Sequence, residues 1–278
     1  MNKTFILFIT LCISLLVITI VISKHHERLY NLRQKYILQN PTKPLKYIPK
    51  KIFQTISDKS KIAPVFQKNI DKLKSQNPDW EYSLFDDSDI EKYVKDHYGG
   101  EYFDCYNMIN PKYGAARADF FRYLLMYREG GVYLDIKSGA EFPLKHIIQP
   151  DDEYILSYWT FPNQFHILNN NTGEYQQWHI ICRPGHPFLS AVIKSVMENI
   201  KTYRISDGVG KLGVLKVTGP IVYTESIMPI VDKCIYRLID DNIAIGLVYN
   251  NINANHKNKY SKPYYGEIDE SIILSLNK

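Results

Sequence analysis

Apolar and polar residues alternate along much of the chain with the periods of amphipathic helices and short buried strands. The pattern is clearest over residues 116–144. An apolar stripe at helical spacing comprises Ala118, Phe121, Leu124 and Leu125. Gly130 and Gly131 then provide a helix stop, and the segment VYLDI predicts a buried strand that ends on Asp135.

The chain before this segment follows the same alternation. Residues 48–53 predict a first strand, with Pro49 at its beginning. Apolar residues at helical spacing within 66–73 predict a helix, which Asn77 and Pro78 end. The segment EYSLF predicts a second strand, and the acidic residues after it can cap a further helix.

The later segments extend this order of strands and helices. EYILSYW predicts a strand, and WHIICRPGHPFLSAVIKSVMENI predicts a strand, a Pro-Gly turn and an amphipathic helix. The C-terminal stretches VTGPIVYTESIMPIV and NIAIGLVYN indicate more of the same mixed fold. We therefore expect an α/β sheet whose ligand lies in the crevice beyond the carboxyl ends of the strands, where Asp135 would sit.

The N-terminus carries a continuous apolar run, FILFITLCISLLVITIVIS, over residues 5–23. It contains no charge and is long enough to cross a hydrocarbon core as a helix of roughly 20 residues. A cleaved signal peptide has a shorter apolar core of about 7–15 residues, so cleavage is the less favoured alternative. The sequence thus predicts a short tail (1–4), a transmembrane anchor (5–23), a stem (24–46) and one folded domain (47–278).

Composition narrows the classes of function. With 278 residues, 45% of them hydrophobic, the chain can bury a full core in one domain. The formal net charge is only +5 and basic residues are mixed with acidic ones, which argues against nucleic-acid binding. The four cysteines are scattered without a Cys-x-x-Cys pair, so we expect no zinc site.

Asp119 and Arg122 are three residues apart on the predicted helix, so they share a face and can contact each other or one ligand. The alternative is a local exposed ion pair, which contributes only roughly a few tenths of a kcal/mol. The tight glycine turn, however, brings the polar residues of helix and strand toward one end of the sheet. Asp135 also ends an apolar strand, where the desolvation of a carboxylate costs free energy. An ionised group at such a position is therefore a candidate for a functional role.

These residues belong to a longer pattern: IPKKIFQT, NPDWEYSLFDD, ARADFFRYLLMYREGGVYLDIKS and PL. The pattern resembles the DXD-containing family of sugar transferases, which includes yeast α-1,6-mannosyltransferases and the catalytic subunits of inositol-phosphorylceramide mannosyltransferases. The glucosylating domains of large clostridial toxins share its core: an Asp, an Arg three residues later, and a strand-end Asp sixteen after the first. Asp119, Arg122 and Asp135 match this core. The likeness extends over residues 48–144, with weaker echoes at RPGHPFL and TGP.

The resemblance implies a GT-A fold, a nucleotide-sugar donor and transfer with retention of anomeric configuration. It implies that the nucleotide base binds at the end of the first strand, at Phe53, Gln54 and Thr55. It assigns the donor sugar and its phosphate to Asp119 and Arg122, and the ribose or a metal ion to Asp135. No dedicated catalytic base is required if the departing phosphate accepts the acceptor's proton.

Lys137 departs from the family pattern, which usually has a second Asp there to complete a Mn²⁺ or Mg²⁺ site under the diphosphate. Three interpretations stay open. In the first, Lys137 partly replaces the metal by contacting the phosphate oxygens directly. In the second, Asp135 still holds an ion together with a more distant carboxylate, Asp269 or Glu267. In the third, the loss of the second Asp has left a pseudoenzyme that binds without turnover.

Other signals are weaker. The family often has a His and a Trp near its end that touch the diphosphate, and here His256 is present without a following tryptophan. GVGKLG (208–213) spells G-x-G-x-x-G, but no apolar strand precedes it, so it predicts a flexible loop rather than a dinucleotide site. The acidic residues at 86–89 predict a helix cap more strongly than a cation site. Trp159 and Trp178 are candidates for stacking on a base or sugar, with core packing as the alternative.

The sequence leaves open on which side of the membrane the body lies. Lys3 precedes the apolar run, whereas four basic residues follow it: Lys24, Arg28, Arg33 and Lys35. The positive-inside bias would therefore keep the body in the cytoplasm. The resemblance implies a lumenal body instead, in a membrane of Golgi or ER type or in a host membrane. The motif at 170–172, Asn-Asn-Thr, would then be a glycosylation acceptor pattern.

Together these patterns predict a single-pass membrane protein with a GT-A-like α/β domain, a Rossmann-like mixed sheet flanked by helices. We expect it to move a hexose of the mannose, glucose or galactose type from a GDP- or UDP-hexose to a glycan or glycolipid acceptor. The alternatives are an inactive nucleotide-sugar-binding relative and a membrane-tethered interaction domain. The sugar, the acceptor and the linkage depend on loops that the sequence does not place.

Overall fold

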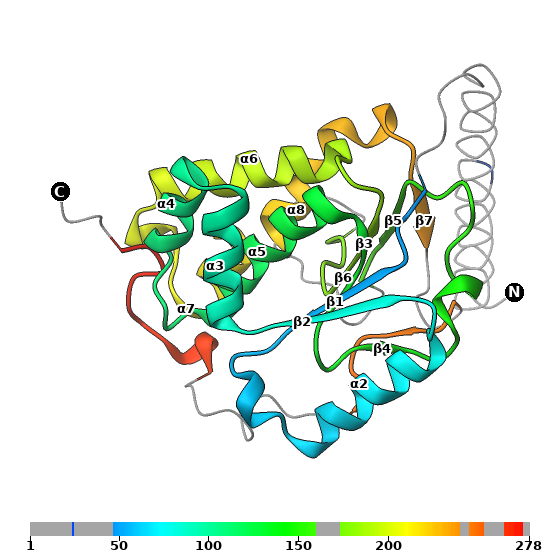
Figure 1. Ribbon diagram of the computed structural model, residues 1–278. Coiled ribbons are helices and arrows are strands. Elements are labelled where there is room, and N and C mark those ends of the chain that lie inside the picture. Colours follow the sequence, from blue (N-terminus) through cyan, green and yellow to red (C-terminus); the bar gives the residue numbers. More distant parts are fainter. Residues whose placement is uncertain (1–23, 25–46, 160–172, 240–244, 253–263, 275–278) are drawn as a thin grey trace, which may run out of the picture. The chain divides into compact units, whose positions relative to one another are not determined.

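The computed structural model describes residues 24, 47–159, 173–239, 245–252 and 264–274. Contacts group Lys46–Lys278 into one compact unit, and its described part is a mixed α/β domain (Figure 1). Among the described residues, no helix is both long and apolar enough to cross a bilayer. The following predicted features lie outside the described residues: the anchor (5–23), nearly all of the stem (24–46), His256 and the motif at 170–172.

A six-stranded mixed sheet forms the centre of the domain, in the order β2-β1-β3-β6-β5-β7. Its strands are β1 (Lys51–Thr55), β2 (Glu81–Phe85), β3 (Gly131–Leu134), β5 (Tyr154–Ser157), β6 (His179–Cys182) and β7 (Arg237–Ile239). β1 is parallel to β2 and β3, and Phe53 is the partner of both Ser83 and Tyr133. β6 runs antiparallel to β3 and β5, whereas β5 is parallel to β7. Two further short strands pair separately, β4 (Gly139–Ala140) and β8 (Leu247–Val248).

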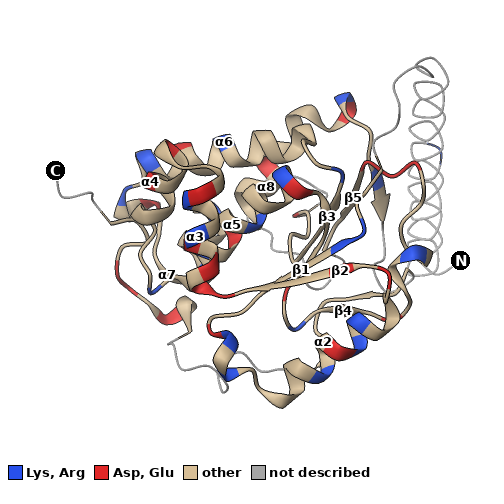
Figure 2. Cartoon of the chain, viewed as in Figure 1, with Lys and Arg blue, Asp and Glu red and all other residues tan. Residues whose placement is uncertain are grey.

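Helices cover both faces of this sheet. They are α2 (Pro64–Gln76), α3 (Asp87–His97), α4 (Gly100–Met108), α5 (Gly114–Glu129), α6 (Pro187–Thr202), α7 (Gly210–Val217) and α8 (Pro220–Ile227). Short 3-10 helices are η1 (Lys59–Lys61), η2 (Leu144–His146), η3 (Ile205–Asp207), η4 (Met228–Lys233) and η6 (Tyr265–Glu267). Figure 1 shows α3 to α6 and α8 on one side of the sheet, while α2 lies on the other side near β4. Basic and acidic residues alternate along the ribbons of α2, α3 and α5 (Figure 2).

Successive residues of the central strands face two separate hydrophobic cores, as the alternation of side chains along a strand requires. On β3, Tyr133 joins the larger core with α5 and α6, whereas Val132 and Leu134 join the smaller core on the α2 side. On β6, Ile180 and Ile181 divide between the two cores in the same way. Because both faces are covered, β3 and β6 are mostly apolar rather than alternating with polar residues, and the one polar residue of β6, His179, shares a hydrogen bond with Ser157.

The turn between α5 and β3 requires glycine at two consecutive positions. Gly130 has φ 62° and Gly131 has φ 97°, both in the region that disfavours side chains. A Cβ on Gly130 would lie 2.6 Å from Pro184 Cδ, and one on Gly131 would lie 2.6 Å from the Lys51 carbonyl oxygen. The predicted helix stop is thus confirmed, and the turn returns the chain directly from α5 to the sheet.

Two predictions about loops had different outcomes. The predicted acidic cap is confirmed, because Asp86 accepts hydrogen bonds from the backbone N–H groups of Ser88 and Asp89 at the start of α3. The prediction that 208–213 is only a loop is wrong, because α7 begins at Gly210 within it. The helix forms there because Val214, Leu215 and Val217 are buried. The element before it is η3 rather than a strand, so the dinucleotide motif lacks its structural context.

Candidate active site

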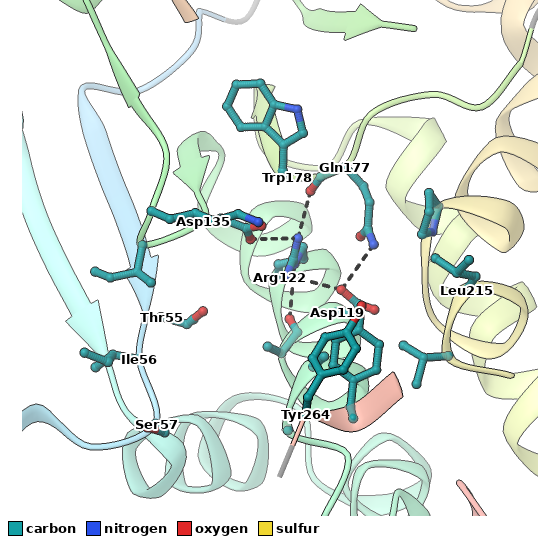
Figure 3. A pocket seen from close by; sticks show the side chains of 18 of the residues that line it. Thr55, Ile56, Ser57, Asp119, Arg122, Asp135, Gln177, Trp178, Leu215 and Tyr264 are labelled. Carbon is teal, nitrogen blue, oxygen red and sulfur yellow. Dashed lines mark hydrogen bonds and ion pairs between the residues drawn. The ribbon is translucent and has the colours of Figure 1, made fainter. Parts of the chain in front are cut away.

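A cavity of about 440 Å³ opens at the edge of the sheet where β1, β2 and β3 end (Figure 3). β5 points to the same edge and β6 begins there, because β6 is antiparallel to both of its neighbours. The cavity wall on this side therefore combines residues next to five strands: Ser57, Asp87, Asp135, Trp159 and Trp178. The helices α5 and α7 supply the facing wall. This is the predicted crevice at the carboxyl ends of the strands.

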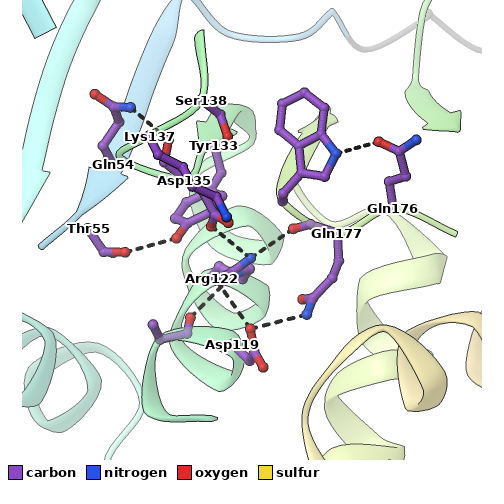
Figure 4. A network of polar contacts seen from close by, with 12 residues as sticks. Gln54, Thr55, Asp119, Arg122, Tyr133, Asp135, Lys137, Ser138, Gln176 and Gln177 are labelled. Carbon is purple, nitrogen blue, oxygen red and sulfur yellow. Dashed lines mark hydrogen bonds and ion pairs between the residues drawn. The ribbon is translucent and has the colours of Figure 1, made fainter. Parts of the chain in front are cut away.

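Asp119, Arg122 and Asp135 meet at this cavity (Figure 4). The Arg122 guanidinium lies between two carboxylates, with Nη2 3.2 Å from Asp119 Oδ1 and Nη1 3.1 Å from Asp135 Oδ1. Asp119 is 5% exposed and Arg122 is 6% exposed, whereas a quarter of the Asp135 side chain reaches solvent. The interpretation of Asp119 and Arg122 as an exposed ion pair is therefore wrong. α5 is buried on the face that the sequence pattern left polar.

Further hydrogen bonds fix the orientation of this ion triad. Arg122 Nη1 donates to the Gln177 carbonyl at 2.9 Å, and the Gln177 side-chain amide donates to Asp119 Oδ1 at 3.2 Å. Thr218 Oγ1 donates to the other oxygen of Asp119 at 3.2 Å. The guanidinium also lies 4.7 Å from the centre of the Tyr133 ring, within the range of a cation–π contact. Asp119 is thus held from several sides, and Asp135 is the more accessible carboxylate.

Burial is the main electrostatic influence on this site. It raises the pKa of the Asp119 carboxyl above its usual range, although the Arg122 guanidinium counteracts this rise and Asp135 adds to it. Burial likewise lowers the pKa of the Lys137 ammonium, while the carboxylate of Asp135 counteracts that fall. Both effects follow from the cost of placing a charge in a poorly solvated cavity wall.

The end of β1 contributes to the cavity, but only one of the three predicted residues, Thr55, lines it. Thr55 lines the cavity and shares a hydrogen bond of 2.9 Å with Tyr133 Oη, and Ile56 and Ser57 line it as well. The assignment of Phe53 to the nucleotide base is corrected, since Phe53 is only 4% exposed and packs in the larger core. β1 ends at Thr55, so of the three predicted residues only the last reaches the cavity, and the residues that follow the strand line it as well.

Gln54 is the second residue whose assignment is corrected. It is fully buried and does not line the cavity. Its Nε2 donates to the Asp135 carbonyl at 3.1 Å, and its Oε1 accepts a hydrogen bond of 2.9 Å from Tyr82 Oη. Gln54 therefore holds the backbone of Asp135 in position instead of contacting a ligand directly.

Lys137 lines the cavity and is only 4% exposed. The donor set around it does not fit a divalent metal, because Asp135 is already paired with Arg122 and a cation occupies the second position of the motif. No group of three His, Cys, Asp or Glu side chains suited to a metal occurs in the described part of the chain. Asp269 and Glu267, the proposed distant carboxylates, are exposed and do not line the cavity.

Several residues of the site were not selected from the sequence. They are Gln177, Thr218, Tyr249 and Lys211, which are distant in sequence from the ion triad. Only Thr218 had a signal, because it belongs to the weak TGP echo. Trp159 and Trp178 both line the cavity, and both also pack against Tyr249, so neither interpretation of them excludes the other.

Comparison with known proteins identifies the family that this arrangement resembles. Residues 64–155 match the family described as glycosyltransferase sugar-binding region containing DXD motif. The chain is 26% identical over 202 residues to the initiation-specific alpha-1,6-mannosyltransferase of Schizosaccharomyces pombe, covering 65% of this chain and 48% of that protein. It is 27% identical over 184 residues to mannosyl phosphorylinositol ceramide synthase SUR1 of Saccharomyces cerevisiae, covering 66% and 43% respectively. The chain thus spans about half the length of the curated relatives it matches.

The fold is similar to that of a solved structure, the PaToxG glycosyltransferase. The TM-score is 0.52 at 19% sequence identity, and the match covers 74% of this chain and 79% of that one. At this identity the likeness concerns the fold alone. The resemblance of the chain to the DXD-containing sugar transferases is therefore confirmed, and residues 64–155, with Asp119, Arg122 and Asp135 among them, match that family's sugar-binding region.

Proposed function

We propose that this chain is a glycosyltransferase that moves a hexose from a nucleotide sugar to a glycan or glycolipid acceptor, with retention of configuration. The observation that carries the proposal is the convergence of Asp119, Arg122 and Asp135 at one cavity beyond the carboxyl ends of the strands. The cavity volume falls within the range of about 300–1,000 Å³ that is usual for small-molecule sites. A mixed sheet with its ligand at this edge suits a GT-A arrangement.

Each charged residue then has a distinct role. Arg122 presents a fixed positive charge to the donor phosphates, because two carboxylates and the Gln177 carbonyl hold its guanidinium. Asp119 accepts from hydroxyl groups of the donor sugar, and the more accessible Asp135 accepts from the ribose. Thr55 and Ser57 lie where the nucleotide base would enter, at the end of β1.

The transfer itself exchanges two bonds at the anomeric carbon. The bond to the diphosphate oxygen breaks, and the bond to the acceptor hydroxyl oxygen forms on the same face of the sugar. The acceptor's proton passes to the departing phosphate, so no side-chain base is needed. The protein's contribution is to align the two oxygens and to offset the negative charge that grows on the leaving group. Arg122 and Lys137 are placed for the second task.

Lys137 supports a version of this reaction that does not depend on a divalent metal. An ammonium can contact phosphate oxygens directly through charge-assisted hydrogen bonds. The test is donor hydrolysis and hexosyl transfer measured with and without EDTA. Activity that is indifferent to EDTA supports this role of Lys137, and activity abolished by EDTA contradicts it. Nucleotide binding without any turnover would indicate the pseudoenzyme instead.

A thermal-shift panel tests the proposed donor class. GDP-mannose, UDP-glucose, UDP-galactose and UDP-N-acetylglucosamine should differ in the rise of melting temperature that they produce, because a ligand that binds only the native state stabilises it. The donor that binds most tightly identifies the base and the sugar. If none of these donors, nor UDP or GDP, changes the melting temperature, the chain is a tethered interaction domain rather than a transferase.

We also propose that residues 5–23 anchor the protein in a membrane. The support is their uncharged apolar sequence, which is long enough for a bilayer. Resistance to alkaline carbonate extraction would separate an integral protein from a peripheral one. A glycan on Asn170 would place the body in the lumen, whereas a body that external protease digests in intact microsomes would lie in the cytoplasm.

A further inference from the structure

The ammonium of Lys137 is held at the cavity by Tyr249, which comes more than a hundred residues later in the chain. Lys137 Nζ donates a hydrogen bond of 2.6 Å to Tyr249 Oη and lies 3.8 Å from the centre of the Tyr249 ring. The lysine is 4% exposed and the tyrosine is 38% exposed, so an accessible ring covers a buried ammonium. Both residues line the cavity. The aromatic face and the hydroxyl together fix an otherwise flexible side chain.

The backbone around Tyr249 is fastened to the loop that carries Lys137. We call residues 247–251 the strap. β8 of the strap pairs with β4, with Leu247 opposite Ala140. Beyond β8, Asn251 N donates to the Lys137 carbonyl at 2.9 Å, and Ser138 Oγ donates to the Tyr249 carbonyl. The position of the Tyr249 ring is therefore tied to the loop after β3.

Asn69 of α2 joins the loop and the strap. Its Nδ2 donates to the carbonyls of Ile136 and Ser138 at 3.1 and 2.9 Å, and its Oδ1 accepts from Asn251 Nδ2 at 2.8 Å. Gly139 leaves room for this junction, because a Cβ there would lie 2.9 Å from Asn251 Nδ2. Three segments far apart in sequence are thus fixed to one another beside the cavity.

Two tryptophans pack against the Tyr249 ring. The Trp159 ring meets it edge-on at 4.9 Å between centres, and the Trp178 ring lies at 5.6 Å. Trp178 is only 3% exposed, and its Nε1 donates to the Gln176 side chain. The ring of Tyr249 is therefore positioned by packing as well as by its contact with the lysine.

The charges around Lys137 explain why its position matters. Within the described part of the chain, the carboxylate of Asp135 and the guanidinium of Arg122 both act on its ammonium. If all of them are ionised, Asp119, Arg122 and Asp135 have a net charge of −1. The ammonium of Lys137 brings the net charge of these four side chains to zero. With an aspartate in place of Lys137, the four groups would have a net charge of −2. A bound divalent cation would bring that net charge to zero, as Lys137 does here. Tyr249 holds the lysine without adding a charge of its own.

We propose that Tyr249 is a positioning residue that holds the Lys137 ammonium where the diphosphate of the donor binds, so that nucleoside diphosphates bind without a divalent cation. This inference rests on the proposed function. It assigns to the strap a part in donor recognition that acts through Lys137. The role belongs to the side chain of Tyr249, because the backbone contacts of the strap do not depend on which residue occupies that position.

The test measures affinities of UDP, GDP, UMP and GMP by isothermal titration calorimetry in EDTA. Tyr249→Phe loses only the hydroxyl and should weaken binding of the preferred diphosphate by about twofold to threefold. Tyr249→Leu also loses the aromatic face and should weaken it by about fivefold to tenfold. Monophosphate binding should change less, so the preference for diphosphate over monophosphate falls in both variants.

A double-variant cycle separates positioning from general support of the fold. Lys137→Met should weaken diphosphate binding, and adding Tyr249→Leu to it should cause no further loss, because the ammonium to be positioned is already gone. Tyr102→Leu on α4 is the matched control, with a similar exposed fraction of 36% and no place in the cavity, and should bind as the original chain does. Thermal unfolding without nucleotide shows whether each variant is folded. If Tyr249→Leu is unstable, Tyr249→Phe still tests the inference, because it keeps the packing of the ring.

Losses from Lys137→Met and Tyr249→Leu that simply add would overturn the inference and leave the proposed function intact. An unchanged preference for diphosphate in Tyr249→Phe and Tyr249→Leu would do the same. If the original chain binds neither UDP nor GDP with or without Mn²⁺, the proposed function itself fails. Binding that requires Mn²⁺ supports a nucleotide site but contradicts the role assigned to Tyr249.

Discussion

Glu174 is a carboxyl group that the fold buries completely, and neither of its oxygens has a hydrogen-bond partner among the residues that the structure describes. It lies three residues before Gln177, which contacts the ion triad. Burial raises the pKa of Glu174 to about 7, and the positive charge of Lys211 only partly counteracts this. Between the ordinary pKa of about 4.5 and the raised value, the folded chain keeps a proton that the unfolded chain releases.

We therefore expect Glu174 to lower the stability of the protein as the pH rises from 5 to 8. A group whose folded-state pKa is raised favours folding while it is protonated and opposes folding once the pH passes that value. Glu174→Gln should raise the free energy of unfolding at pH 8 by roughly 1–3 kcal/mol and change it little at pH 5. Urea denaturation at the two pH values measures this. Glu225→Gln, an exposed change on α8, is the control, and a less stable Glu174→Gln at pH 8 would contradict the account.

Asp135 is the residue of the ion triad whose replacement we expect to affect function more than stability. Its side chain is a quarter exposed, unlike the buried Asp119. We expect Asp135→Asn to change the free energy of unfolding by less than about 1 kcal/mol. Donor hydrolysis should nevertheless fall by about a hundredfold, because the charge that fixes Arg122 on the cavity side is lost.

The measurement for Asp135→Asn pairs urea denaturation with the rate of donor hydrolysis. Asp96→Asn, an exposed change on α3 away from the cavity, should leave both values unchanged. If Asp135→Asn destabilises the fold as much as it slows hydrolysis, the carboxylate is a structural partner of Arg122 only.

At the scale of elements, the α5–β3 turn decides whether the ion triad can form, since Asp119 and Arg122 come before it and Asp135 after it. We expect Gly131→Ala to destabilise the protein by about 2–4 kcal/mol, because it adds a clash with the Lys51 carbonyl to an unfavourable φ. Gly185→Ala is the matched control, with φ 67° but no atom of the described residues within 4 Å of the new Cβ, and should cost about 1 kcal/mol.

Thermal or urea unfolding of the two glycine variants gives the comparison directly. Equal losses would mean that the close approach of Gly131 to β1 is relieved by a small backbone shift. UDP binding should also weaken in Gly131→Ala more than in Gly185→Ala, since a shift of β3 against α5 would move Asp135 relative to Arg122.

Local patterns predicted much of the element order, because each element's signal lies within its own residues. Proline begins α2, an Asp caps α3, and glycines end α5. The C-terminal helices were harder to predict. The stretch VTGPIVYTESIMPIV is rich in β-branched residues, yet residues 220–227 form α8 because most of their side chains are buried beside α6 and α7. Tertiary burial overrides local preference there.

At the scale of the whole molecule, the cavity draws on residues from Thr55 to Tyr265. The sequence predicted the part of the site with a fixed spacing, namely Asp119, Arg122 and Asp135. It did not predict Gln177. The contact of Gln177 with Asp119 spans more than fifty residues, and such a contact produces no periodic pattern in the sequence. It also placed Phe53 in the site, although the pleat turns that side chain into the core.

We expect bound UDP to protect these distant segments together. Hydrogen–deuterium exchange should slow at residues 55–57, 135–137, 177–178 and 245–252 when UDP is present, because the ligand favours the closed native arrangement of the cavity wall. The helix α6 should be unaffected, since none of its residues lines the cavity. Protection confined to 55–57 would show that the nucleotide engages only the end of β1.

The attachment of the strap to the loop after β3 has a consequence for how this site can be transplanted. Residues 64–155, which match the sugar-binding family, contain the ion triad but lack Thr55, Gln177 and Tyr249. A fragment excised at those limits would expose Asp119 and leave Lys137 without its aromatic cover. Grafting residues 64–155 into another scaffold would fail for the same reason. The matched segment supplies only part of the site, and the other residues come from before and after it in the chain.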